Sequence, residues 1–290
     1  MKEKENREQV KCCPVCSSAV WTFCYDKLDQ KLETKDRCVK CRTCGAFFIE
    51  NRLNQRFIIQ KFYKDRNSIG SIEKYLKKKF YLEKVVKELK RFLPKKSVVF
   101  DIVCGGGALL KFMKDYGYNV FGLEVSEEAK EESEAVIGLK NIICCGDFLE
   151  LDFNENFFDA VLMTDVVEHL HNPHIYLEKI TKILKPRSLL VIRTPNSDCF
   201  FHKLVKQRWM LSSPRHIVIY NRNSLLALLE KNKFKVIYFS REKHIQTNLF
   251  PSFSQGFNNF LRGFAVNFLR KLFALIGKGE SITIIARRNF

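Results

Sequence analysis

Four cysteines near the start of the chain have the types and spacing that suggest chemistry most directly. Cys13 and Cys16 form one C-x-x-C pair, and Cys41 and Cys44 form a second pair 24 residues later. Two tight turns of this kind can aim four thiolates at one ion, and a closed tetrahedral set of four cysteines is typical of structural zinc. The ion would supply a core to a segment with few large apolar residues. We therefore predict a structural zinc site here, with no open position for catalysis.

The start of the chain and its cysteine content indicate the cellular compartment. The chain starts with a charged stretch that lacks the apolar core of a secretory signal, and it has no run of 18 uncharged apolar residues. We therefore expect a cytoplasmic protein whose 11 cysteines serve as metal ligands or buried thiols, not as disulfides. Seven of them lie between positions 12 and 44, so three further cysteines are alternative ligands: Cys12, Cys24 and Cys38.

A glycine-rich loop forms the second group. The loop Asp101-Ile102-Val103-Cys104-Gly105-Gly106-Gly107 follows an apolar run at 98–100. Glycines let the backbone turn tightly and approach a ligand closely. Glu124 ends the next apolar run, where a carboxylate can accept hydrogen bonds from ribose hydroxyls. Because Leu110 stands where a G-x-G-x-x-G motif has its third glycine, the pattern disfavours a dinucleotide and favours a cofactor without phosphates.

The elements that must position these groups alternate between strands and helices. Apolar runs predict strands at 98–100, 120–123, 141–144, 158–163, 189–192, 234–239 and 281–286, with helices at 108–116, 173–184 and 224–230 and another capped by Ser126. This alternation predicts an α/β fold with a doubly wound, Rossmann-like parallel sheet. The expected parts are a tail (1–10), a zinc ribbon (11–50, closed by a strand at 47–49), a helical linker or cofactor cover (51–94) and the α/β domain (95–290).

From about residue 98 to 287 the chain resembles the class I S-adenosylmethionine-dependent methyltransferases, in the block V-F-D-I-V-C-G-G-G-A-L-L above all. With its four-cysteine start it is similar to members of sugar, glycan and ubiquinone pathways. The resemblance implies S-adenosylmethionine as cofactor, bound by Asp101, Cys104, Gly105, Gly107, Glu124, Asp147, Phe148 and Thr164. Val103 replaces the glycine usual in the family, and its β-branched side chain would crowd the cofactor.

The segment after the fourth predicted strand carries candidate catalytic groups. Asp165, Glu168 and His169 are spaced i, i+3 and i+4, so they share one face if the segment is helical. This stretch resembles the ubiquinone-type O-methyltransferases, which implies a divalent metal near the acceptor hydroxyl. The alternative, which we favour on the residues alone, is a helix capping box made by Asp165 and Glu168.

Three further histidines fall in this half of the chain. His171 is a second candidate base, and His174 is expected on the surface of the helix that follows. His216 belongs to a P-x-H-x-x-x-Y stretch at 214–220 that resembles a segment beside the acceptor pocket of the same subgroup. It is therefore a candidate to orient or deprotonate the acceptor, with a structural role as the alternative.

Charge and amphipathicity indicate the kinds of partner. Residues 97–200 carry 17 acidic and 9 basic residues, whereas each flank has a net charge of +13. Basic flanks suit an anionic partner such as nucleic acid or a membrane surface, or are simply solvated. An apolar stripe along 257–276 predicts an amphipathic helix at 255–277 that could contact a membrane, cover the acceptor pocket or form a dimer.

The leading interpretation is methyl transfer to a hydroxyl of a small-molecule, sugar or lipid-linked intermediate. The alternatives are an RNA methyltransferase and a non-catalytic binding module in which Val103 closes the cofactor site. The fourth strand is followed by Thr164-Asp165-Val166-Val167, in place of the [DN]-P-P-[YF] motif that serves methylation of a base amine. The sequence leaves the acceptor atom and the oligomeric state open.

Overall fold

A computed structural model of the chain describes residues 6–29, 34–58, 79–138, 140, 142–199, 202, 215–242, 279 and 281–289. The amphipathic helix expected at 255–277 lies outside these residues, as does much of the expected helical linker. Within the described ranges, no helix combines the length and the apolar character needed to span a bilayer.

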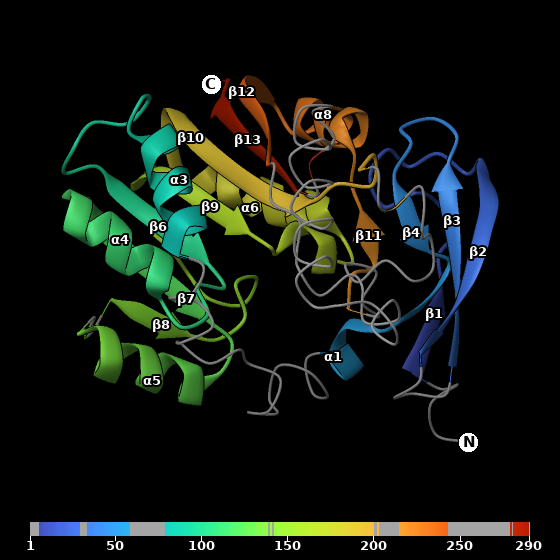
Figure 1. Ribbon diagram of the computed structural model, residues 1–290, viewed down its shortest axis with the longest axis horizontal. Helices are drawn as coiled ribbons and strands as arrows, with labels where there is room; N and C mark the ends of the chain where they lie inside the picture. The colour runs from blue at the N-terminus through green and yellow to red at the C-terminus, as the bar shows by residue number, and fades with distance from the viewer. Residues whose placement is uncertain are drawn as a thin grey trace, which may run out of the picture.

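A seven-stranded sheet forms the centre of the molecule, in the order β12-β13-β10-β9-β6-β7-β8 (Figure 1). Its strands are β6 (Val98–Ile102), β7 (Asn119–Glu124), β8 (Ile143–Cys145), β9 (Phe158–Thr164), β10 (Leu184–Pro195), β12 (Phe234–Glu242) and β13 (Ser281–Arg288). The strands from β6 to β10 pair in parallel, which confirms the doubly wound α/β prediction. Their apolar runs suit strands that are covered on both faces.

The last strand departs from the all-parallel expectation, because β13 runs antiparallel to both β10 and β12. The register explains this reversal. Ser281, at the start of β13, lies opposite Glu242, at the end of β12, so the chain re-enters the sheet at the edge where it left. A strand that returns from the same edge can pair only in the antiparallel sense.

Helices cover both faces of this sheet. They are α3 (Lys79–Leu89), α4 (Ala108–Tyr116), α5 (Glu127–Ile137), α6 (Pro173–Ile183) and α8 (Arg222–Lys231). The predicted cap is confirmed, since the Ser126 hydroxyl accepts a hydrogen bond from the Ala129 amide at the start of α5. The chain winds outward from β6 to β8 and then crosses back to β9. The carboxyl edge beside β6 is therefore the topological switch point, where such sheets bind their ligands.

Gly122 allows α4 to pack closely on β7. A Cβ atom at this position would lie 2.6 Å from the Leu110 Cδ1 atom and 2.9 Å from the Cys104 sulfur. Dinucleotide-binding folds make this room with a glycine on the helix. Here the helix keeps Leu110, and the strand provides the glycine instead.

The N-terminal segment forms two small sheets. One consists of β1 (Arg7–Gln9) and β5 (Asn51–Leu53), and the other has the order β11-β4-β3-β2, with β2 (Trp21–Asp29), β3 (Thr34–Cys41), β4 (Phe47–Ile49) and β11 (Val218–Ile219). Strand β4 was predicted. Two boundaries were not, because the expected tail contributes β1 and the expected helical linker starts with β5 before the short helix α1 (Gln55–Ile58). The two strands pair with each other, and Arg7 forms an ion pair with the buried Asp36 carboxylate at 2.8 Å.

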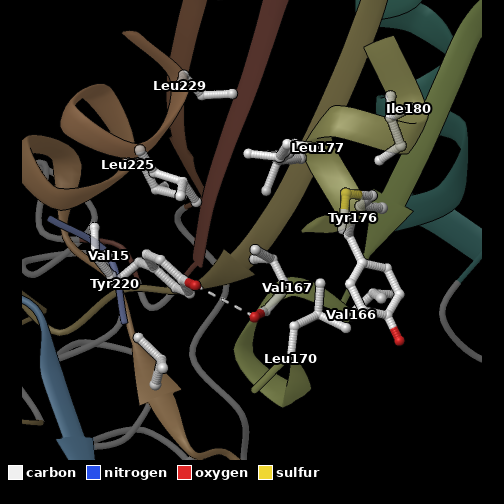
Figure 2. Packing of buried hydrophobic residues seen from close by; sticks show 14 of the residues in the cluster. Val15, Val166, Val167, Leu170, Tyr176, Leu177, Ile180, Tyr220, Leu225 and Leu229 are labelled. Carbon is white, nitrogen blue, oxygen red and sulfur yellow. Dashed lines mark hydrogen bonds between the residues drawn. The ribbon is translucent and has the colours of Figure 1, made fainter. Parts of the chain in front are cut away.

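The ribbon, meaning residues 6–58, shares one hydrophobic core with the sheet. Val15 packs in the same buried cluster as Leu177 of α6, Tyr220, and Leu225 of α8, and Figure 2 shows these side chains together. A separate cluster that includes Met113 fills the opposite face under α3 and α4. Because the ribbon contributes to the first cluster, it is part of the folded domain and not a separate appendage.

Candidate active site and cysteine cluster

The glycine-rich loop at the carboxyl end of β6 has an unusual backbone. Val103, Gly105 and Gly107 all have left-handed φ angles, of 60°, 55° and 66°. Glycine adopts this region without steric cost, whereas a β-branched residue is strained there. The Gly105 amide donates a 2.7 Å hydrogen bond to the Glu124 carboxylate at the end of β7, so the two predicted cofactor groups are held together.

Two buried carboxylates border this loop. Glu124 also accepts hydrogen bonds from the Val125 and Ser126 amides, at 2.9 and 3.4 Å. Asp101 is 1% exposed, and its Oδ1 atom has no hydrogen-bond partner among the residues that the structure describes. Burial, together with the Glu124 charge, raises the pKa of Asp101 well above its ordinary value, and burial also raises the pKa of Glu124.

This donor set fits S-adenosylmethionine. Two carboxylates would repel a phosphate, but they can accept hydrogen bonds from ribose hydroxyls and favour the cationic ammonium and sulfonium groups. The loop leaves room for a close approach of the backbone, and Glu124 still has lone pairs beyond those used by the three amides.

The remaining predicted cofactor residues surround the same edge. The Gly146 amide donates to the Glu124 carbonyl, which places Asp147 beside the end of β7, where its carboxylate accepts from the Leu149 amide at 2.8 Å. The Phe148 ring is buried and stacks on Tyr176, with ring centroids 5.7 Å apart. Thr164 ends β9, next to β6 in the sheet, and Cys104 is a buried thiol whose pKa is raised by burial.

Two of the predicted catalytic histidines meet beyond β9. His169 lies in a short 3-10 helix, η4 (Val167–His169), and His216 directly precedes Ile217 and β11. Their ring centroids are 4.8 Å apart in an edge-to-face arrangement. His169 Nδ1 lies 2.8 Å from the Arg215 carbonyl oxygen, so Nδ1 carries the proton and Nε2 the lone pair. Burial lowers the pKa of His169 to about 4, so this imidazole is neutral at pH 7.

Glu168 is fully buried behind this pair. The Thr194 hydroxyl donates to its Oε2 atom at 2.9 Å, and Oε1 has no hydrogen-bond partner within the described part of the chain. Burial and the nearby Asp165 raise the pKa of Glu168 to about 8. Its carboxylate, His169 and His216 offer ligand atoms within 4.8 Å of one another, a set that could hold a metal ion.

The capping-box prediction for this segment is wrong. The helix is a single 3-10 turn, its N-cap is Val166, and no side chain caps it. Asp165 has a left-handed φ of 58° and pairs with Arg193 at the end of β10. Because that ion pair occupies Asp165, it is not one of the three clustered ligand groups. The run V-I-R-T-P-N contained the signal, since it places Arg193 and Thr194 at the neighbouring strand end.

His171 bonds to the ribbon and is not part of the His169–His216 pair. Its Nε2 atom is 2.7 Å from the Leu53 carbonyl oxygen of the ribbon, and no described residue bonds to its buried Nδ1 atom. Arg52 donates to the His171 carbonyl as well. These contacts attach η4 and the following loop to β5.

The four predicted cysteines converge in the ribbon. The Cys13 and Cys44 sulfurs are 3.7 Å apart, the Cys16 and Cys41 sulfurs are 3.6 Å apart, and all four lie within 4.8 Å of one another. A zinc ion with Zn–S bonds of ~2.3 Å requires sulfur–sulfur distances of about 3.8 Å, so the geometry fits. Cys12, Cys24 and Cys38 are not members of this cluster.

The two cysteine turns have the same construction. Each turn bonds the amide after its second cysteine to the carbonyl of its first: Ser17 to Cys13, and Gly45 to Cys41. Ser17 and Gly45 both have a left-handed φ, of 63° and 77°. A repeated backbone turn therefore aims each pair of thiols at the same point.

Helices of the α/β domain hold both turns from outside. His174 of α6 lies 3.0 Å from the Val15 carbonyl oxygen through Nε2, and its Nδ1 accepts from Asn232 at the end of α8. At the other end of α8, Asn221 donates to the Gly45 carbonyl at 3.1 Å. His174 therefore connects α6 to the ribbon, whereas the sequence predicted only a surface position.

A comparison with known protein families identifies the domain. A family model described as a methyltransferase domain matches residues 75–238, which is more than half of the chain. The chain belongs to this methyltransferase family. The matched region contains the whole glycine-rich loop, Glu124 and the histidine pair.

Curated proteins similar to this methyltransferase include enzymes of quinone pathways. A ubiquinone biosynthesis O-methyltransferase of Maricaulis maris is 29% identical over 126 residues, which are 39% of this chain and 47% of that protein. An uncharacterized protein of Methanocaldococcus jannaschii is 30% identical over 151 residues, 52% of this chain and 60% of that one. This chain thus spans less than two thirds of the length of these relatives.

Solved structures share the fold of this methyltransferase. A Haemonchus contortus phosphoethanolamine N-methyltransferase 2 in complex with S-adenosyl-L-methionine has a TM-score of 0.52 and 17% identity, over 83% of this chain and 61% of that chain. An S-adenosylmethionine-dependent methyltransferase of Archaeoglobus fulgidus has a TM-score of 0.50 and 20% identity, over 75% and 100% of the two chains. At these identities the likeness shows the fold alone.

Proposed function

We propose that the protein transfers the methyl group of S-adenosylmethionine to a hydroxyl of a small-molecule acceptor, of the sugar, lipid-linked or quinol type. The observation that carries this proposal is the pairing of two groups along one sheet edge: the loop bonded to Glu124, and the neutral His169 beside His216. The quinone-pathway enzymes among the relatives support a hydroxyl acceptor.

Different residues of the chain bind the cofactor and remove the proton of the acceptor. When bound, S-adenosylmethionine supplies a methyl group that its sulfonium has already activated. Asp101, Glu124 and the loop hold the cofactor. His169 Nε2 takes the proton of the acceptor hydroxyl as its oxygen becomes methylated, because the Arg215 carbonyl keeps the other ring nitrogen protonated. A neutral imidazole is the form that can accept this proton.

The cysteine cluster has a structural role in this proposal. Cys13, Cys16, Cys41 and Cys44 would hold one zinc ion with all four positions filled, so the ion fixes the ribbon and takes no part in methyl transfer. Zinc analysis of the purified chain, with one ion expected per molecule, tests this part.

The test of function uses the full chain. Calorimetry with S-adenosylmethionine comes first, followed by transfer of a labelled methyl group to catechols, hydroxylated sugars and lipid-linked phenols. We expect binding and transfer to at least one hydroxyl class, with His169→Gln and His216→Gln each lowering kcat about 10²–10⁴-fold. Lys182→Gln is the comparison variant, and it should retain the activity because it removes only an exposed ion pair with Glu178 on α6.

Two outcomes would contradict the proposal. Lack of cofactor binding at millimolar concentration would favour a non-catalytic module. Methylation of RNA with steep salt dependence, and of no hydroxyl compound, would favour the nucleic-acid alternative. Assays with and without added magnesium show whether the Glu168, His169 and His216 group acts as a metal site.

A further inference from the structure

Strand β11 connects the ribbon to the histidine pair. It has two residues, and it pairs antiparallel with β4 in the register Val218↔Phe48 and Ile219↔Phe47. His216 stands two residues before its first residue. Figure 1 shows β11 beside β4, at the ribbon side of the large sheet. The strand that positions His216 therefore belongs to the ribbon's sheet and not to the central sheet.

Ile217 makes the connection continuous. Its amide donates to the Glu168 carbonyl in η4 at 3.0 Å, and its carbonyl accepts from the Ile49 amide at 3.1 Å. Ile217 is fully buried, so water cannot replace either hydrogen bond. A path of backbone hydrogen bonds thus runs from β4 to the 3-10 turn that carries His169.

The second cysteine turn leads directly into β4. Cys41 ends β3, and the Cys41 amide bonds the Ala46 carbonyl, so the second cysteine turn is the connection between β3 and β4. Next to β11, Asn221 donates to the Gly45 carbonyl of the same turn. A Cβ atom at Gly45 would lie 2.8 Å from Asn221 Nδ2, which shows how tightly the two segments pack.

We propose that the metal-loaded ribbon is the positioning element of the acceptor site. The metal fixes the turn at 41–46, and this turn fixes β4. Strand β4 pairs with β11. Strand β11 in turn positions His216 and the Arg215 carbonyl that orients His169. The inference rests on the proposed function for the role of the histidine pair. The cofactor site is positioned differently, by bonds within the α/β domain: Gly105 and Glu124 bond to each other, and further bonds join them to Val125, Ser126, Ser133 and Gly146.

The test follows side-chain signals in the full chain, labelled with ¹⁵N in histidine and with ¹³C in the methionine methyl groups. Loss of the ribbon metal through Cys41→Ser, which leaves the Glu168, His169 and His216 group intact, should displace the His169 and His216 signals and expose the His169 Nδ1 proton to exchange. Chelation of the wild type, checked by elemental analysis, should have the same effect, and added zinc should reverse it. The Met113 methyl signal, from the core on the opposite face, should remain, and the Kd for S-adenosylmethionine should change less than about twofold.

A side-chain variant tests the same path by weakening the hold of the ribbon on its metal. Asn221→Asp keeps the oxygen that caps α8 but loses the donor to Gly45, so zinc retention should weaken by ~10–100-fold. The histidine signals should then move at correspondingly lower chelator concentration. Lys231→Met is the matched control, because it removes a solvent-exposed contact to Ser17 of the other turn and should behave as wild type.

Unchanged histidine signals in the zinc-free protein would overturn the inference. So would loss of the Met113 signal together with them, because the metal would then hold the whole fold. Equal zinc loss in Lys231→Met and Asn221→Asp would remove the specific role of the Asn221 contact. If the protein binds no S-adenosylmethionine, the proposed function fails, yet the histidine signals still decide whether the ribbon positions the pair.

Discussion

The two halves of the sheet's carboxyl edge are built in different ways. The cofactor half, made of the loop 103–107 and Glu124, is held by contacts between residues close in sequence, such as the Gly105–Glu124 bond across 19 positions. The proposed acceptor half, made of Glu168, His169 and His216, is held by distant contacts. His169 and Arg215 are 46 positions apart, and Asn221 reaches Gly45 across 176.

This difference separates binding of the methyl donor from selection of the acceptor. A locally built cofactor half can keep its geometry while the other half changes. If the acceptor half depends on the ribbon as we propose, a change in the ribbon alters the acceptor site without altering the loop. We therefore expect a substitution in one half to leave the geometry of the other half unchanged.

The largest expected effect is in the ribbon. Cys41→Ser removes one of the four converging sulfurs, and we expect loss of the metal and of stability on the order of 5 kcal/mol, a part of the ~10–16 kcal/mol that zinc gives to zinc-finger peptides. Elemental analysis measures the metal content, and thermal unfolding measures the stability. Cys12→Ser, at an exposed neighbouring cysteine, should change neither, and equal losses in the two variants would contradict the assignment of ligands.

The second prediction concerns the cofactor half alone. Glu124→Gln leaves an amide hydrogen of the loop or of Val125 without its acceptor and weakens the contact to ribose, so the Kd for S-adenosylmethionine should rise about 30-fold, or about 2 kcal/mol. Glu127→Gln, on the exposed face of α5, should leave the Kd unchanged. Should Glu124→Gln also displace the His169 signal, the two halves would not be separable.

The sequence predicted the structure of the cofactor half better than that of the acceptor half. The loop, the α4 boundaries and the Ser126 cap were predictable because short segments determine them. Asp165 was misassigned to a cap because Arg193, on another strand, takes its carboxylate. The sequence named His169 and His216 separately, but no local pattern could pair them, since β11 and the ribbon bring them together.

The third prediction tests packing beneath the cofactor loop. Gly122→Ala would place a methyl group 2.6 Å from Leu110, so α4 or β7 must shift, at a cost of ~1–3 kcal/mol. Urea unfolding measures the loss. Adding Leu110→Ala should recover part of it, because the second change makes room for the first. If the double variant is simply the sum of two losses, the contact is not the cause.

The fourth prediction uses the buried Asp101. Its pKa is higher in the folded chain than in the unfolded chain, so folding is favoured at low pH. This advantage is lost as the pH rises from about 4 through the folded value, with a slope of at most ~1.4 kcal/mol per pH unit. Asp101→Asn should flatten the pH dependence of urea unfolding above pH 5. Asp115→Asn, exposed on α4, should not, and an identical pH dependence of unfolding in the wild type and in Asp101→Asn would contradict the prediction.

The smallest expected effect is at Val103, in the glycine-rich loop of the cofactor half. Its φ of 60° is strained for a β-branched residue, although its side chain packs against the core. Val103→Gly should therefore stabilise the chain by about 1 kcal/mol and tighten S-adenosylmethionine binding, because the cofactor gains the space of the side chain. Val103→Ala separates strain from packing: it keeps the left-handed Cβ and loses contacts, so it should destabilise the chain. If Val103→Ala and Val103→Gly change the stability by the same amount, side-chain packing and not backbone strain governs this position. Valine would then be an unstrained part of the cofactor site.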